Sequence, residues 1–357
     1  MKRLGFYVLS IGFLLALVGI MAMAVPAQSQ TFKLRYTTAY PPPPYPDSAM
    51  EQKWMDMVTQ RSNGRITWEA FFGGALGGPS ETFRLVSSGA ADAGAVAYGV
   101  HSAEFPLYSW EFCFPFGPPD PKAAIRAANE LWNAFPHFEE MVKKQNLHHL
   151  FIVPWDCYNM ASVKRISTVA DLKGKRAGVW GIYFPKWFEA VGASGVATAS
   201  TERYMMLQTA LLDISVLPVQ PTVKLKLQEV TKYWVNANFG PSLAHANSIN
   251  LNTWKKLPPD LQKIMTDASR EIEEIAAQSL LDAREQDMQT LKRAGLEIIT
   301  MSNEEIKKWA DRIPDMGTDW AKEMVAKGYP GWEMAEKWIQ ACEKQGHKWS
   351  RRWAVKK

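Results

Sequence analysis

Several hallmarks of common protein classes are scarce in this chain of 357 residues. Its 3 cysteines are too few for a disulfide-built scaffold and are not spaced like zinc ligands. Lys and Arg exceed Asp and Glu by only 5 (41 minus 36), so no concentrated basic face of a nucleic-acid-binding protein is indicated. A mean hydropathy of -0.22 excludes a polytopic membrane protein.

Motifs for catalysis, cofactors and metals are also missing. The chain has no HExxH, no GxSxG, no GK[ST] and no GxGxxG after a strand, and the glycine-rich turn Gly73–Gly78 lacks the lysine of a phosphate loop. His148 and His149 would face opposite sides of a strand and so could not share one metal. We therefore expect no cofactor, no metal and no enzyme, although catalytic groups assembled in space would escape this test.

The first 27 residues have the pattern of a secretory signal peptide. Lys2 and Arg3 precede an uncharged apolar run over residues 4–24, and small residues at Ala22–Ala27 suit a cleavage site. We expect removal of 1–27 and a mature protein in the periplasm. The alternative is an uncleaved membrane anchor, since the apolar run is long enough to span a bilayer. An odd number of cysteines leaves at least one free thiol, and we expect free buried cysteines, with one disulfide still open.

The remaining chain alternates strand and helix patterns. Strands are predicted at 32–36, 65–71 and 93–97, with helices at 47–61 and 79–88 between them, which indicates a mostly parallel sheet. A second α/β unit begins near residue 154. The longest helical pattern, 258–294, would be roughly 50 Å long, more than one domain needs, so we expect it to brace both.

Four stretches, in order, resemble the extracytoplasmic solute-binding proteins of TRAP transporters, the DctP type. They are Asn63–Gly78 with Val86–Asp92; Ile166–Gly174; Val191–Ala193 with Glu202–Tyr204, Leu207–Thr209 and Asp213; and Asn250–Gln262. The resemblance implies an α/β, two-lobed periplasmic binding protein fold with hinge strands and a long helix spanning both lobes. Lobe 1 would comprise residues 28–153 plus about 240–275, and lobe 2 would comprise 154–239 plus about 276–357.

The same resemblance implies a function. The protein would be a monomer that captures a small organic solute in the cleft between its lobes and delivers it to integral-membrane TRAP permease subunits. Two alternatives stay open: a receptor module that reports ligand to a sensor system, and an extracytoplasmic enzyme on a bilobed fold.

One departure from the family pattern concerns the ligand. An Arg that grips the ligand carboxylate usually follows the Leu-Lys-Gly motif by four residues, but this position is Gly178. A second family Arg would fall near Tyr158. Arg176 could face the cleft instead, or be a surface charge at the start of its strand.

We therefore hypothesise a cleft without the usual guanidinium–carboxylate pair. Aromatic walls suit a flat aromatic ligand, and an added carboxylate such as Asp156 suits a cationic or zwitterionic one. The alternative is that the rings belong to the core. The candidate ligand-binding residues are Tyr40, Tyr98, Trp155, Asp156, Tyr158, Asn159, Arg176, Gly178, Trp180, Tyr183 and Asn238.

Overall fold

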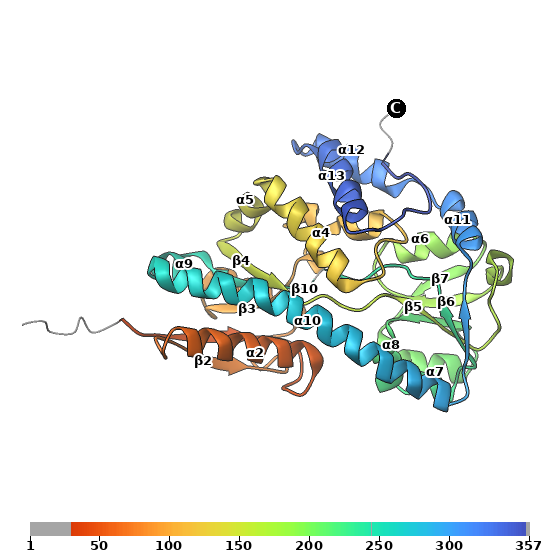
Figure 1. Cartoon of the computed structure of the whole chain (residues 1–357), viewed down its shortest axis with the longest axis horizontal. Coiled ribbons are helices and arrows are strands. Elements are labelled where there is room, and N and C mark those ends of the chain that lie inside the picture. Colours follow the sequence, from red (N-terminus) through yellow and green to blue (C-terminus); the bar gives the residue numbers. More distant parts are fainter. Residues whose placement is uncertain (1–29, 244, 355–357) are drawn as a thin grey trace, which may run out of the picture.

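The computed structural model describes residues 30–243 and 245–354, so the expected signal peptide lies outside the described residues. Two sheets organise the molecule, one in each lobe (Figure 1). The first has the order β2-β1-β3-β10-β4, and the second has the order β11-β9-β5-β8-β6-β7. The predicted two-lobed α/β fold is confirmed.

The first lobe begins with the predicted alternation of strands and helices. β1 (Phe32–Thr37) pairs in parallel with β2 (Ile66–Phe71) and β3 (Ala93–Ala97), and α2 (Pro46–Arg61) and α3 (Pro79–Ser88) connect them. β10 (His245–Asn250) then returns antiparallel between β3 and β4 (Leu147–Ile152). Further helices of this lobe are α4 (Pro121–Ala134), α5 (His137–Lys144) and α9 (Leu251–Lys256).

The second lobe surrounds a shorter-stranded sheet. Its strands are β5 (Asn159–Ser162), β6 (Arg176–Val179), β7 (Ser194–Ala197), β8 (Ile214–Leu217), β9 (Tyr233–Asn236) and β11 (Glu297–Thr300). The parallel strands β6, β7 and β8 point their carboxyl ends in one direction. The helices are α6 (Phe184–Glu189), α7 (Arg203–Gln208), α8 (Val219–Lys224) and α11 (Asn303–Arg312).

Two extended segments cross between the lobes side by side. Residues 153–158 lead from β4 to β5, and residues 239–243 lead back toward β10. Their backbones are hydrogen-bonded, with Trp155 N donating to Ser242 O at 2.8 Å and Tyr158 N to Gly240 O at 3.0 Å. These paired segments are the hinge strands that the resemblance implied.

A third connection is α10 (Pro259–Arg293), a helix of 35 residues that is about 52 Å long at 1.5 Å per residue. It packs against α2, α4 and β4 of the first lobe and against α8 of the second (Figure 1). The prediction of a helix that braces both lobes is confirmed.

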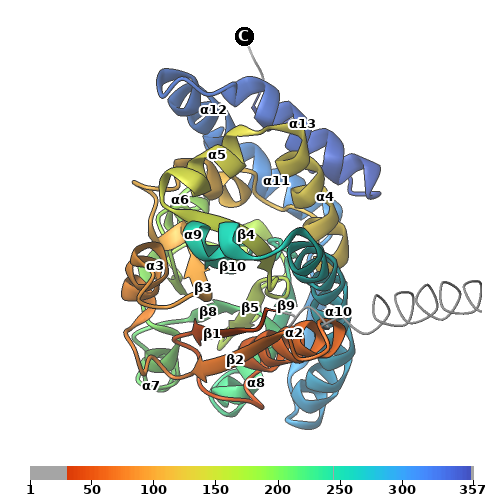
Figure 2. The same cartoon turned by 90° about the vertical axis from the view of Figure 1, so that its left-hand side faces the viewer.

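The C-terminal helices require a correction. α12 (Met316–Ala326) and α13 (Gly331–Lys344) were expected in lobe 2, but they pack on α4 and on the 3-10 helix Pro106–Cys113, both from the first part of the chain (Figure 2). Aromatic contacts explain this position, since Trp338 meets the ring of Trp110 edge-on at 5.7 Å. Aromatic burial across the cluster therefore draws the C-terminal segment back onto lobe 1.

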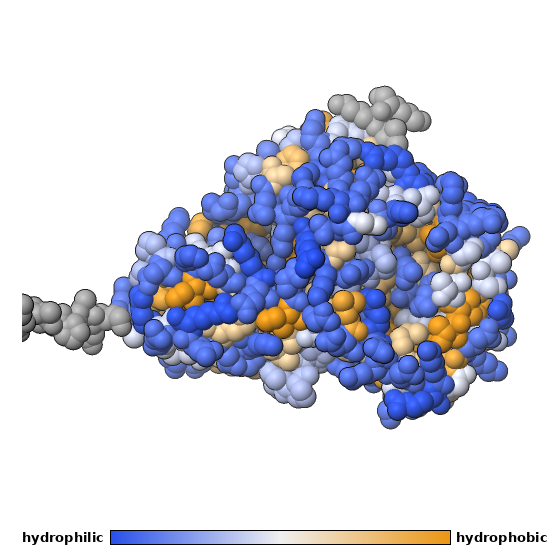
Figure 3. Space-filling model, in the orientation of Figure 1, coloured by the Kyte–Doolittle hydropathy of each residue, from blue (hydrophilic) through white to orange (hydrophobic). Residues whose placement is uncertain are grey.

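Cys113, Cys157 and Cys342 are buried and, within the described part of the chain, no disulfide joins any two of them, as expected. Among the described residues, no helix is both long and apolar enough to cross a membrane. The face seen in Figure 3 is mostly hydrophilic, and its apolar residues lie in separate small groups.

Candidate ligand-binding site between the lobes

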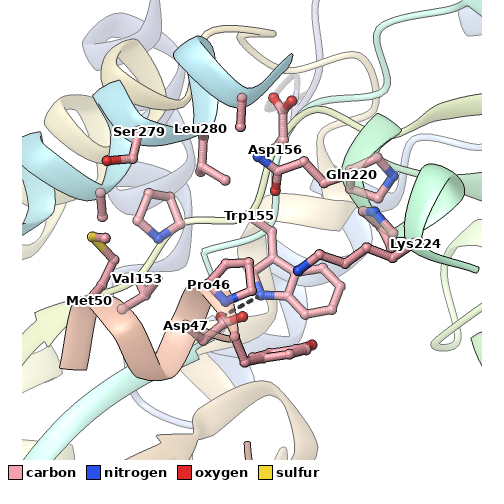
Figure 4. Close-up of a pocket in the computed structure, with 16 residues that line it drawn as sticks. Pro46, Asp47, Met50, Val153, Trp155, Asp156, Gln220, Lys224, Ser279 and Leu280 are labelled. Atoms are coloured by element: carbon pink, nitrogen blue, oxygen red, sulfur yellow. Dashed lines mark hydrogen bonds between the residues drawn. The ribbon is translucent and has the colours of Figure 1, made fainter. Parts of the chain in front are cut away.

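A cavity of about 240 Å³ lies between the two lobes and against the crossing segment 153–156 (Figure 4). Each of four elements contributes part of its lining. The residues are Tyr45, Pro46, Asp47 and Met50 around the start of α2; Val153, Pro154, Trp155 and Asp156 of the crossing segment; Gln220, Pro221 and Lys224 of α8 with Pro218 just before it; and Ala276, Ser279, Leu280 and Ala283 of α10. We call this cavity the interlobe pocket.

Local sequence explains how α2 and α8 reach the pocket. The proline-rich loop before α2 cannot continue strand β1, and Pro46 occupies the first helical turn, where its missing N–H costs nothing. Pro218 likewise precedes α8 directly after β8, so α8 starts at the carboxyl end of that strand. Both helices therefore present their first turns to the gap between the lobes.

Trp155 forms the centre of the pocket wall. Its indole N–H donates to Oδ1 of Asp47 at 3.0 Å, the bond drawn in Figure 4. Its ring stacks on His245 with centroids 4.9 Å apart and planes 9° from parallel. Tyr40 continues the layer, because it hydrogen-bonds His245 and stacks on Tyr45 at 5.8 Å. Predicted residues Trp155 and Tyr40 thus belong to one aromatic layer beside the pocket.

Charges of opposite sign meet across this pocket. Burial raises the pKa of Asp47 to about 6, while the Trp155 hydrogen bond and Lys224 oppose that rise. Lys224 comes from the other lobe, and its Nζ lies 5.0 Å from the centre of the Tyr45 ring. One helical turn after Asp47, Glu51 is buried, and no described residue forms a hydrogen bond with its Oε2. Desolvation raises the pKa of Glu51 well above its usual value.

A second aromatic group contacts both lobes. Tyr158 lies 5.9 Å from Trp180, and Trp180 meets Phe112 of the first lobe edge-on at 4.8 Å. Tyr183 follows on the same loop and is only partly buried, with Lys186 Nζ at 5.7 Å from its ring centre. Tyr98 differs, because it is 1% exposed, bonds Ser248 at 2.6 Å and packs on Phe105, which places it in the core of lobe 1.

The polar candidates Asp156, Asn159 and Asn238 line another cavity, of about 330 Å³, against α10 on the second lobe. Asp156 also reaches the interlobe pocket, but Arg284 Nε donates to its Oδ2 at 2.9 Å and neutralises it. The Oδ1 of Asn159 accepts from the backbone N–H groups of Ala237 and Asn238, both at 2.9 Å. The side chains of Asp156 and Asn159 therefore bind protein groups, and we do not keep Asp156 as the partner of a cationic ligand.

Comparison with known proteins identifies the family of this chain. The model of bacterial extracellular solute-binding proteins, family 7 (DctP), matches residues 41–323. The chain belongs to this family. The resemblance inferred from the four motif stretches is thereby confirmed. A curated solute-binding protein of Albidiferax ferrireducens is 21% identical over 262 residues, covering 71% of this chain and 75% of its own.

Solved structures of TRAP solute-binding proteins share the fold. A TRAP periplasmic solute-binding protein of Desulfovibrio salexigens, in an open complex, has a TM-score of 0.80 and 24% identity over 88% of this chain and 96% of its own. A marine metagenome TRAP protein specific for aromatic acid ligands, in complex with 3-hydroxybenzoate, has a TM-score of 0.73 and 20% identity over 89% and 100%. A third, from Desulfovibrio salexigens with bound orotic acid, has a TM-score of 0.72 and 22% identity over 88% and 100%.

The structure also places Arg176, which could have faced the cleft, and Gly178, where the chain departs from the expected pattern. Arg176 lies at the amino end of β6 and its Nε donates to Asp213 at 3.1 Å, so it is held about 10 Å, three strand residues, from the carboxyl edge. Gly178 offers no empty space, because an added Cβ would lie 2.7 Å from Leu212 Cδ1 and 3.4 Å from Arg203 Cδ. We therefore do not keep Arg176 as a ligand residue.

The sequence patterns indicated neither Lys224 nor Asp47 as a pocket residue. One feature of the sequence could have indicated Asp47 as a pocket residue. It directly follows a run of prolines and tyrosines, which puts its carboxylate close to aromatic rings. Lys224 had none, because a lysine on a short amphipathic helix is ordinarily a solvated charge. Only the packing of one lobe on the other brings the two together.

Proposed function

We propose that this family 7 protein captures a small organic acid or zwitterion in the interlobe pocket, in the periplasm, and delivers it to a TRAP-type permease of the membrane. One observation carries the proposal: the pocket walls come from both lobes and from the hinge segment between them. Such a site is complete only when the lobes are together, and closure both excludes water and marks the loaded state.

Size and chemistry support a ligand with one ring. A cavity of about 150 Å³ holds a benzene ring, so 240 Å³ has room for a ring with a short substituent. Tyr45 and Trp155 offer aromatic faces for stacking. Lys224 is a cation for a carboxylate, and Asp47 accepts from a hydroxyl or an amine.

The ligands of two structural relatives, 3-hydroxybenzoate and orotic acid, are ring acids of this size. The relatives share the fold at low identity, so they support the class of ligand rather than its identity. We propose no catalytic step and no cofactor or metal.

Native mass spectrometry of the mature protein tests this proposal. We expect a monomer carrying one small molecule, and release by denaturation would identify it. A Trp155→Ala variant should carry less of it, whereas Trp254→Ala, whose ring stacks on His148 away from the pocket, should carry as much. If the molecule is absent and no compound from pools of acids, zwitterions and cations raises the melting temperature, the capture proposal fails.

A further inference from the structure

Lys224 places a cation of the second lobe against the wall of the first. Its side chain extends from α8 toward Trp155 and Asp47 (Figure 4). The Nζ atom lies 5.0 Å from the centre of the Tyr45 ring, within the range of a cation–π contact. No ion pair joins this ammonium group to an acid among the described residues. The interlobe pocket is therefore lined by a cation that the protein itself supplies.

The acid that attracts this cation from the first lobe is Asp47. It is 6% exposed and lines the pocket, and within the described chain its one side-chain hydrogen bond comes from the Trp155 indole. Burial raises the pKa of Asp47 to about 6, so the group is mainly ionised at neutral pH. Burial and the charge of Asp47 raise the pKa of Glu51, which favours its neutral form. Lobe 1 therefore presents one buried negative charge to the pocket.

Tyr45, Trp155 and Asp47 together have the composition of an ammonium-binding site. Aromatic faces attract an organic cation, and a desolvated carboxylate adds a charged hydrogen bond. Tyr40 stacks on Tyr45 at 5.8 Å and so helps to hold that ring in place. Lys224 already uses this chemistry, because its ammonium group lies over Tyr45 and in the field of Asp47.

Lys224 can be displaced from this position at low cost. Its side chain is exposed, and a lysine stem loses rotamer freedom whenever its head is fixed. Lys224 would repel a second cation in the pocket unless the ligand also brought an anion. Asp287 of α10 attracts Lys224 as well, but it does not line the pocket. A carboxylate inside the pocket is therefore the group that draws Lys224 away from the Tyr45 ring.

We propose that Tyr45 and Asp47 form an ammonium subsite of the pocket, and that Lys224 occupies it until a zwitterionic ligand binds. The ligand's carboxylate pairs with Lys224, and its protonated amine takes the place of the Lys224 ammonium group. This inference rests on the proposed capture function and narrows its ligand to a ring compound that carries both an acid and an amine.

The test compares zwitterions with acids that lack the amine. The probes are 3-(aminomethyl)benzoate with 3-methylbenzoate, and pipecolate with cyclohexanecarboxylate, measured by calorimetric titration at neutral pH. Asp47→Asn removes the charge but keeps an acceptor for the Trp155 indole. Asp56→Asn, at an exposed position on the same helix, is the matched control.

We expect wild type and Asp56→Asn to bind at least one zwitterion about 30-fold more tightly than its amine-free partner, and Asp47→Asn to lose most of that preference. A wild-type protein that binds neither zwitterion more tightly overturns the proposal, and so does an Asp47→Asn variant that keeps the preference. An amine-free acid released in native mass spectrometry overturns it too, but leaves the capture function standing.

Lys224→Met provides a second measurement that does not depend on the Asp47 variant. Benzylamine, an amine without an acid, should bind Lys224→Met about tenfold more tightly than wild type, because the competing ammonium group is gone. Lys226→Met, also exposed and two residues on, controls for the change in net charge. No gain in Lys224→Met, or an equal gain in Lys226→Met, would show that Lys224 does not occupy the subsite.

Discussion

The two lobes contribute side chains of opposite charge to the region between them. Lobe 1 brings the buried acids Asp47 and Glu51 among tyrosines and His245. Lobe 2 brings the cations Lys224 and Arg203. In the part of the chain that the structure describes, no ion pair involves any of these four side chains. A molecule with a negative group and a separate hydroxyl or amine fits this polarity in one orientation only.

The largest effect is expected from Gly178→Arg, which would bring a further guanidinium next to Arg203 in the cationic lobe. Its Cβ would lie 2.7 Å from Leu212 Cδ1, and its side chain would compete with Arg203, so stability should fall by about 3 kcal/mol or more in urea unfolding. The double variant Gly178→Arg with Arg203→Leu should recover much of that loss. Additive losses would show that the two positions do not share one volume.

Trp155→Ala should have the next largest effect, because it removes the contacts that join the hinge segment to Asp47 and His245 of lobe 1. The variant loses the stack on His245 and leaves Asp47 without its indole donor. We expect about 100-fold weaker binding of the captured solute, or roughly 2.7 kcal/mol, by calorimetric titration. Trp155→Phe keeps the ring without the donor and should lie between the two, and equal affinities of all three proteins would remove Trp155 from the site.

Asp47→Asn tests the ionisation of the buried Asp47 carboxyl group in lobe 1. The folded-state pKa of Asp47, about 6, is above the unfolded value of about 3.9, so its contribution to stability is complete below pH 4 and is lost as pH rises through 6. Wild type should therefore lose about 2 to 3 kcal/mol relative to Asp47→Asn between pH 4 and 7. Urea unfolding of both proteins across this range measures it, and parallel pH curves would contradict the raised pKa.

Lys224→Met should have the smallest effect, because its cation is exposed at the mouth of the pocket. Affinity for an acidic ligand should fall about tenfold, while the free energy of unfolding should stay within about 0.5 kcal/mol. Lys226→Met, two residues on and also exposed, is the matched control. The same loss in both variants would mean that only net charge matters, and that Lys224 has no specific place opposite Asp47.

The fold was more predictable than the site for a physical reason. Periodicity along the chain fixes a helix such as Pro259–Arg293 and the alternation of β1 to β3, since those patterns are local. Whether Asp156 can bind a ligand depends on its ion pair with Arg284, which is 128 residues away in the sequence. No local pattern encodes that pairing. Gly178 could be recognised as a departure, but only the structure shows that the Leu212 side chain fills the space beside it, with Arg203 of α7 in contact.

The long helix α10 has a mechanical consequence. Its fully buried residues are concentrated between Leu261 and Ala277, and Leu291 is buried near its far end, while Ser279 to Ala283 span the open pocket. The helix is therefore packed along much of its length on the first lobe and near its C-terminal end on the second, with a short span between them that is less buried. We expect this arrangement to limit closing motions to flexing of that span and twisting about the helix axis, and to oppose free separation of the two lobes.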